Sequence, residues 1–379
     1  MDIQEIKAQL ERYHGFLSQD PDNSRLICQI AQLQLQVGDF ENAGMTLNTA
    51  LEKQPDDTSL QFNLSHVYLA EGEFQKALDI LSPLDQKINN SAIKYNLAYA
   101  LLHMKKYEDA LYQFELIIDT ENLPADTHYW LGRCYYYTGD ILNAEKYLQQ
   151  HISDNSENSR TLGTLALLNI DNGNPEQARQ FAELALALND ENPEALISMG
   201  NIYLEQQDEE RAYDYFYKVS TAHPSNGRAW SGLGLTRMMK LDSGNAIEDL
   251  KKATHFMPSH LGTWHALAWA QLVSDDVAGA RESLENCLDI DRTFAETYGG
   301  LAIIDIIQGY SEAAKEKIKL ALRLDRHCFS ANFAQSLILE NSAPDQSRKI
   351  IENMLQTQFS NGNSLKGLLG KQLRKYKKH

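Results

Sequence analysis

The stretch Arg228–Pro258, RAWSGLGLTRMMKLDSGNAIEDLKKATHFMP, decides the fold of this chain of 379 residues. Its Ala246 belongs to a column of alanines that recur every 34 residues, with a single step of 33. The column runs through Ala43, Ala77, Ala110, Ala144, Ala178, Ala212, Ala246, Ala280 and Ala314. A fixed period of this length is typical of a structural repeat rather than of a single globular core.

Two further columns keep the same period. Twelve residues before each alanine stands a small residue: Ala31, Ser65, Ala98, Gly132, Ala166, Gly200, Gly234, Ala268 and Ala302. Directly before each of these stands an apolar residue: Ile30, Leu64, Leu97, Leu131, Leu165, Met199, Leu233, Leu267 and Leu301. Small side chains let two antiparallel helices approach closely, and the apolar neighbour fills the groove between them. The pattern predicts pairs of helices that stack and share one continuous core.

This pattern resembles the tetratricopeptide repeat, a helix–turn–helix unit of 34 residues with a W-x-x-L-G signature followed by Ala and Pro. Trp230, Leu233, Gly234, Ala246 and Pro258 match that signature. The resemblance covers roughly residues 24–360. It implies an all-α solenoid, a right-handed superhelix whose concave wall is lined by the first helix of each repeat.

The period divides the chain into four predicted parts. Residues 1–23 form an amphipathic capping helix that ends near Pro21, and residues 24–328 hold nine tandem repeats. Residues 329–360 form a divergent terminal repeat, in which Arg348 replaces the alanine. Residues 361–379 form a basic amphipathic helix or tail.

The charge of the chain is unevenly distributed. The formal net charge is −17, yet residues 353–379 contain six Lys and Arg and no Asp or Glu, so residues 1–352 carry −17 − 6 = −23. An acidic body argues against nucleic acid as the main partner, because phosphate binding needs a basic face. The tail has two interpretations: a cover for the last repeat, or an arm that contacts an anionic partner, a membrane surface or the protein's own acidic groove.

The sequence favours a cytoplasmic protein without a transmembrane segment. No window is long and apolar enough for a membrane span, and the N-terminal residues lack the apolar core of a signal peptide. The cysteines Cys28, Cys134, Cys287 and Cys328 are far apart and form no C-x-x-C pair. They are expected to be buried thiols in a reducing compartment.

No motif points to catalysis, so the chain is expected not to be an enzyme. It contains no G-x-S-x-G, H-E-x-x-H or Walker loop, and no cofactor is implied. His255, His260 and His265 are five residues apart, which places them on different faces of a helix and argues against a metal site.

Function is therefore expected on the concave wall, where the resemblance implies which positions of each repeat face the groove. In repeats two to four these positions include Phe62, Asn63, His66, Tyr95, Asn96, Tyr99, Tyr129, Arg133, Tyr136 and Tyr137. Tyrosines make good anchors, and the two asparagine amides can clamp the main chain of an extended peptide. The alternative is that some of these tyrosines pack between helices. The run Tyr135–Tyr137 favours binding slightly, because one helix cannot bury three consecutive residues on one face.

Later repeats offer other surfaces. Repeats five and six contribute Asn201 among mainly acidic residues, and repeats seven to nine contribute apolar residues that include Met239 and Trp269. Such an apolar groove suits a partner helix, although ordinary helix packing explains it equally simply. Arg237, Gln271 and Asp305 occupy equivalent positions in successive repeats, which predicts a buried polar ladder between repeats.

The sequence thus predicts a non-catalytic scaffold or adaptor that binds a protein or peptide in its groove. Two alternatives remain open: an escort chaperone for a secretion, pilus or envelope client, and a regulatory docking subunit of a transferase. The carboxylate clamp of chaperone-binding relatives is not expected, because Tyr95 and Tyr129 stand where that clamp needs basic residues. Homodimerisation through terminal repeats is also open.

Overall fold

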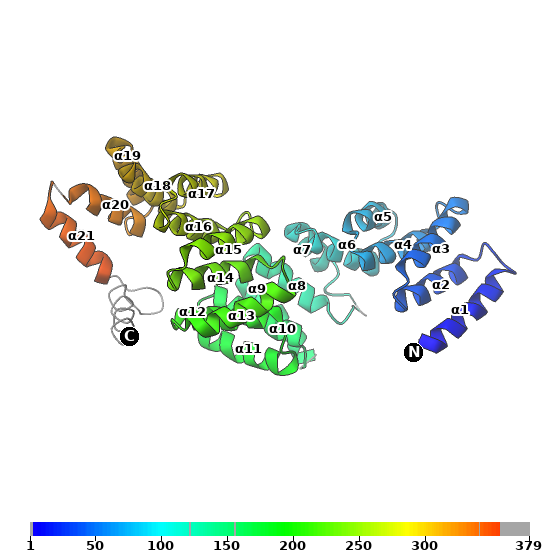
Figure 1. The fold of residues 1–379 in the computed structure, drawn as a ribbon. Coiled ribbons are helices and arrows are strands. Elements are labelled where there is room, and N and C mark those ends of the chain that lie inside the picture. Colours follow the sequence, from blue (N-terminus) through cyan, green and yellow to red (C-terminus); the bar gives the residue numbers. More distant parts are fainter. Residues whose placement is uncertain (1–2, 121–122, 155–156, 341, 357–379) are drawn as a thin grey trace. The chain divides into compact units, whose positions relative to one another are not determined.

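In a computed structural model of the protein, the described residues (3–120, 123–154, 157–340 and 342–356) form helices joined by short turns (Figure 1). A single helix precedes ten consecutive helix pairs, which we call repeats 1 to 10; within each repeat the first helix is A and the second is B. The helices are α1 (Ile3–Leu17), α2 (Ser24–Gln36), α3 (Phe40–Lys53), α4 (Thr58–Glu71), α5 (Phe74–Lys87), α6 (Ser91–His103), α7 (Tyr107–Glu115), α8 (Thr127–Thr138), α9 (Ile141–Asp154), α10 (Ser159–Asp171), α11 (Pro175–Leu188), α12 (Pro193–Glu205), α13 (Glu209–Ala222), α14 (Gly227–Met239), α15 (Ser243–Phe256), α16 (Leu261–Val273), α17 (Val277–Ile290), α18 (Ala295–Ile307), α19 (Ser311–Leu324), α20 (Phe329–Leu339) and α21 (Pro344–Gln356).

The alanine column and the small-residue column both lie at the contact between the A and B helices of a repeat. All nine alanines of the 34-residue column are fully buried. The small residues twelve positions earlier lie against the B helix of the same repeat. A Cβ atom at Gly132 would lie 2.8 Å from Leu148, and one at Gly234 would lie 2.5 Å from Leu250. Because even one additional carbon would clash, these positions set how closely the A and B helices approach.

The turn between A and B has the same backbone in the first nine repeats. One residue in each turn has a positive φ between 60° and 86°: Gly38, Gly72, Lys105, Gly139, Gly173, Gln207, Leu241, Asp275 and Gly309. A left-handed residue ends an α-helix because its N–H turns back to the last carbonyl groups. Glycine adopts this conformation without strain, and the four other residue types pay a steric cost for it.

Polar side chains begin many of the A helices. Asn192 Oδ1 accepts a hydrogen bond from the Ala195 N–H at 2.9 Å, and Asn226 Oδ1 accepts one from the Ala229 N–H at 3.2 Å. Each asparagine satisfies one of the amide groups that a helix leaves unpaired at its start.

The chain divides into two compact bodies, residues 1–157 and residues 158–379, and each is described by itself. Body 1 contains α1 to α9, and body 2 contains α10 to α21. In body 1, α1 packs on α2 and buries Ile6. In body 2, α20 packs on α18 and α21 packs on α20. The predicted basic tail, residues 361–379, lies outside the described residues.

Candidate protein-binding surface

Three neighbouring A helices of body 1 carry most of the predicted binding residues. They are α4, α6 and α8, and each contacts the next. Because equivalent positions of stacked repeats lie side by side, the aromatic residues on these helices come together into one surface.

The centre of this surface is a cluster of rings from three repeats. The ring centroids of Tyr99 and Trp130 are 5.2 Å apart in an edge-to-face arrangement, and Tyr99 lies 4.5 Å from His103. Phe74, the first residue of α5, stacks on His103 at 4.7 Å. Aromatic pairs in such geometries stabilise one another beyond the area that they bury. We call Phe74, Tyr99, His103 and Trp130 the aromatic cluster.

Arg133 borders the aromatic cluster and is surrounded by rings. Its guanidinium carbon lies 5.4 to 5.7 Å from the ring centroids of Tyr129, Trp130 and Tyr137. It donates hydrogen bonds to the hydroxyl groups of Tyr129, at 3.3 Å, and Tyr137, at 2.8 Å. Tyr137 also stacks on Tyr107 at 4.4 Å. The cation is therefore held in one orientation by cation–π contacts and hydrogen bonds.

Asp126 joins two repeats beneath this surface. Its Oδ1 accepts from the Tyr95 hydroxyl at 2.6 Å, and its Oδ2 accepts from Trp130 Nε1 at 2.7 Å. Burial and the Asp126 carboxylate raise the pKa of Tyr95 well above its usual value, so the hydroxyl remains a donor to Asp126. Tyr95 is thus fixed by an internal bond and does not offer a free hydroxyl to a partner.

The two asparagines differ in their hydrogen bonding. Asn63 is buried: its Oδ1 accepts from Gln32 Nε2 at 3.0 Å, and its Nδ2 donates to the Ser59 carbonyl at 2.9 Å. In the next repeat, the residues equivalent to Gln32 and Asn63 are His66 and Asn96. Their buried atoms His66 Nε2 and Asn96 Nδ2 have no hydrogen-bond partner among the described residues. Phe62 contacts the His66 ring edge-on at 4.5 Å.

The structure separates the predicted tyrosines into supporting and exposed residues. Tyr129 is 1% exposed and Tyr136 is also buried, so the expectation that they face a groove is not met. Both turn into the packing between helices, where Tyr129 supports Arg133. In the run Tyr135–Tyr137, the first two residues are buried and Tyr137 is 41% exposed. Tyr135 stacks on Tyr147 of α9, at 5.5 Å.

Asn201, Met239 and Trp269 lie in body 2, on α12, α14 and α16. Asn201 Nδ2 donates to the Ile197 carbonyl of its own helix at 2.9 Å. Met239 is half-buried, and Trp269 packs against the core cluster that contains Ile303. These three residues therefore belong to body 2, whereas the aromatic cluster belongs to body 1.

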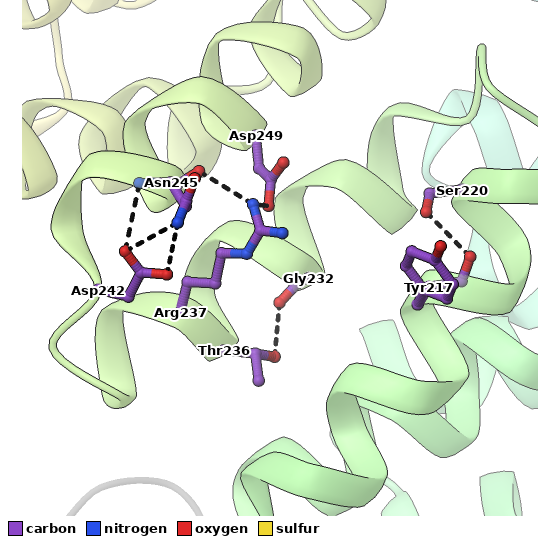
Figure 2. A network of polar contacts seen from close by, with 8 residues as sticks. All are labelled: Tyr217, Ser220, Gly232, Thr236, Arg237, Asp242, Asn245 and Asp249. Atoms are coloured by element: carbon purple, nitrogen blue, oxygen red, sulfur yellow. Dashed lines mark hydrogen bonds and ion pairs between the residues drawn. The ribbon is translucent and has the colours of Figure 1, made fainter.

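Arg237, Gln271 and Asp305 do not bond to one another as a ladder between repeats. Each pairs instead with the residue twelve positions later, on the B helix of its own repeat. Arg237 forms an ion pair with Asp249, with 2.6 Å between Nη1 and Oδ2 (Figure 2). A 2.7 Å hydrogen bond joins Gln271 to Ser283 Oγ, and Asp305 lies 2.5 Å from Lys317 Nζ. Asp305 also reaches Arg281 of the preceding repeat, at 2.6 Å.

The positions of Arg237 and Asp249, twelve residues apart on the A and B helices, hold different residue types in other repeats. In repeat 6 they hold Tyr203 and Tyr215, whose stacked ring centroids are 5.6 Å apart. Ion pairs and hydrogen bonds replace ring stacking in repeats 7 to 9. Each member finds a partner within its own repeat because the A and B helices of one repeat pack against each other.

Two residues of the surface were missed by the sequence interpretation. Phe74 and Tyr107 are the first residues of α5 and α7, on B helices, where no groove position was expected. A signal was present, because Phe40, Phe74 and Tyr107 are equivalent residues and this position is aromatic in repeats 1 to 3 but not in later repeats.

Within the part of the chain that the structure describes, no cluster of His, Cys, Asp and Glu has the arrangement of a metal site. The same residues contain no helix that combines the length and the apolar character needed to cross a bilayer.

The fold and this surface define the class of the protein as a helical-repeat α-solenoid. Three family models match its sequence: the anaphase-promoting complex, cyclosome, subunit 3 model over residues 36–117, and two tetratricopeptide repeat models over residues 125–153 and 164–227. None of these models describes a catalytic domain. Residues 125–153 and 164–227 thus match tetratricopeptide repeats in sequence, and the helix pairs of the described residues have the fold of such repeats.

One relative found by sequence comparison contains the same kind of repeat. The chain is 31% identical over 118 residues to a TPR repeat-containing protein of Methanocaldococcus jannaschii, a match that covers 31% of this chain and 21% of that relative. This chain thus spans about a fifth of the length of that relative.

Solved structures show the same fold at low sequence identity. The human IFIT1 dimer with PPP-AAAA is 17% identical, with a TM-score of 0.57, and the match covers 93% of this chain and 92% of that one. The APC/C hetero-tetramer Cut9–Hcn1 is 14% identical, with a TM-score of 0.57, and covers 94% of this chain and 77% of that one.

Proposed function

We propose that the protein is a non-catalytic scaffold or adaptor that binds an extended protein segment on the A-helix face of repeats 2 to 4. Concave faces of stacked repeats are the usual binding surfaces of solenoids. The observation that carries the proposal is the ordered surface formed by the aromatic cluster, Arg133 and the exposed ring of Tyr137.

The surface provides contacts of two kinds. Tyr137 and His103 are exposed at its edge and are held by ring stacking, so a partner immobilises few additional rotatable bonds when it packs on them. The guanidinium of Arg133 adds a cation within the same surface. These features suit a segment with an aromatic or aliphatic anchor next to an acceptor group.

The unsatisfied polar atoms next to this surface support main-chain recognition. Burial lowers the pKa of His66, so its ring is neutral at pH 7 and one ring nitrogen is a hydrogen-bond acceptor. A peptide N–H can donate to His66, and a peptide carbonyl can accept from Asn96 Nδ2. A buried polar atom without a partner costs about 1–3 kcal/mol, and such bonds would recover part of that cost. Because both atoms are closed to water, a small side-chain rotation must accompany binding.

The cysteines support a reducing, cytoplasmic location. Cys28, Cys134, Cys287 and Cys328 are all free and buried. A chain that folds in an oxidising compartment usually pairs its cysteines in disulfides.

Affinity purification coupled to mass spectrometry tests the proposal. The bait is the full chain, compared with the variants Tyr137→Ser and Asn96→Ala. The control is Tyr112→Ser, since Tyr112 is an exposed tyrosine on the B helix α7. We expect a protein recovered with the unchanged chain and the control to be depleted about tenfold with both test variants. Equal recovery with all four baits would refute binding at this face.

A further inference from the structure

A column of residues in body 2 changes from acidic to apolar along the stack. The thirteenth residue of each A helix from α10 to α18 is Asp171, Glu205, Met239, Val273 and Ile307, exactly one repeat apart. We call these five residues the edge column. Contacts between α10 and α12, α12 and α14, and α14 and α16 place successive members side by side. Trp269 of α16, packed with Ile303 of α18, continues the series.

The apolar end of the edge column is open to solvent. Val273 is 69% exposed and Ile307 is 55% exposed, and the adjoining turns add the exposed residues Leu241 and Tyr310. Large exposed apolar side chains that gather on one face of a protein mark an interaction surface. The exposed carboxylates Asp275 and Asp276 follow Val273 and Ser274 in the next turn, so the surface combines apolar and acidic groups.

The chain itself carries a segment of the opposite pattern. After α21 ends at Gln356, the sequence continues with Leu365, Leu368, Leu369 and Leu373, followed by Arg374, Lys375, Lys377 and Lys378. Leucines come first and most of the bases come last. With increasing distance from the C-terminal repeat, the edge column likewise presents apolar residues first, at Ile307, Val273 and Met239, and then the acid Glu205; Asp171 beyond it is already paired with Arg228 at 2.9 Å.

We propose that residues 365–378 of this same chain bind along the edge column. The leucines cover Ile307, Val273 and Met239, and the terminal lysines lie beside Glu205. Charge favours this occupant, because the segment from 353 onward holds six bases and no acid while residues 1–352 carry −23.

The lengths are compatible with this placement. Ile307 and Glu205 are three repeats apart, which corresponds to about 30 Å for helices that pack about 10 Å apart. Residues 365–378 span about 20 Å as a helix and up to about 45 Å when extended. Residues 357–364 connect them to α21, which packs on α20, which in turn packs on α18. Since a bound tail occupies this face, a partner must displace it to use the same apolar residues.

Zero-length carbodiimide crosslinking of the full chain tests the inference, because it joins lysine amines only to carboxylates in contact. At sub-micromolar protein concentration, mass spectrometry is expected to find Glu205 linked to Lys375, Lys377 or Lys378 in the monomer band. Glu205→Gln must abolish that link. The exposed Glu210 of α13 supplies the control, and Glu210→Gln must leave it unchanged.

A second set of variants tests the apolar contact. Val273→Ser combined with Ile307→Ser is expected to reduce the yield of the Glu205 link roughly tenfold, because a hydroxyl group replaces each covered apolar group without adding charge. Leu184→Ser, at an exposed leucine on α11, is the matched control. All three substitutions are at exposed sites, and circular dichroism checks that each variant retains its helices.

Three results would overturn the inference. The first is linkage of the tail lysines to Asp345 or Glu352 of α21 in place of Glu205, which would make the tail a cover for the last repeat. The second is a yield that falls with dilution, which would show contact between molecules. The third is the absence of any link between Glu205 and the tail.

Discussion

The ion pair of Arg237 and Asp249 offers a direct test of how repeat 7 is stabilised. The Asp249 side chain is 3% exposed and that of Arg237 is 23% exposed, and Nη1 lies 2.6 Å from Oδ2 (Figure 2). Removing one partner of a buried pair leaves an uncompensated charge, which typically costs about 3–5 kcal/mol. Since water reaches the arginine, we expect Arg237→Met to lower the free energy of unfolding by about 2–4 kcal/mol.

A neighbouring repeat supplies the matched control. Asp305 is buried to the same degree but has two cations, Lys317 at 2.5 Å and Arg281 at 2.6 Å. Lys317→Met leaves Arg281 in place, so we expect a loss of about 1 kcal/mol or less. The double variant Arg237→Met with Asp249→Leu replaces the pair by apolar groups and should recover most of the stability lost in Arg237→Met.

The pH dependence of the Arg237→Met variant follows from the same burial. Burial raises the pKa of Asp249, and Arg237 opposes that rise. An acid whose pKa is higher in the folded state binds more protons there than in the unfolded state, so stability falls as pH rises through the interval between the two values. Because loss of Arg237 widens this interval upward, the deficit of the variant must be larger at pH 7.5 than at pH 5.

Urea unfolding followed by circular dichroism measures both effects, and hydrogen exchange localises them to α14 and α15. A cost for Arg237→Met no greater than that for Lys317→Met, with no dependence on pH, would refute the argument. It would show that the Asp249 carboxylate does not need a cation in the folded protein.

Three further outcomes are expected. Leu241→Gly should raise the free energy of unfolding by about 0.5–1 kcal/mol in urea titrations, because Leu241 has φ 60° and relief of left-handed strain exceeds the entropy cost of glycine; a net loss would contradict this account of the turns. Tyr129→Ala should cost about 3–5 kcal/mol by cavity formation, whereas Tyr137→Ala should cost about 1 kcal/mol or less; equal losses in thermal melts would show that exposure does not separate the two tyrosines. Burial raises the pKa of Cys134 and that of Cys287 to about 12, so both thiols should react with Ellman's reagent at pH 8 only after unfolding, and rapid labelling of the native protein would contradict their burial.

The sequence by itself determined the repeat and its internal packing. The period placed Gly132 and Gly234 where helices touch, and the structure shows that neither position has room for a Cβ atom. This succeeds because contacts within a helix pair are local: the residue that faces the partner helix depends on helical geometry and on a short turn. The expectation that aromatic residues of repeats 2 to 4 gather on one surface rests on the same regularity.

Only the tertiary structure decided which of those residues are exposed and which partner each polar group takes. Tyr129 and Tyr137 lie about two turns apart on the same helix, yet Tyr129 is buried and Tyr137 is open, because the packing of neighbouring helices covers only one of the two rings. Arg237 pairs with Asp249 because α14 and α15 pack against each other. The division between residues 157 and 158 falls at a boundary between repeats, but the 34-residue period does not distinguish this boundary from the others.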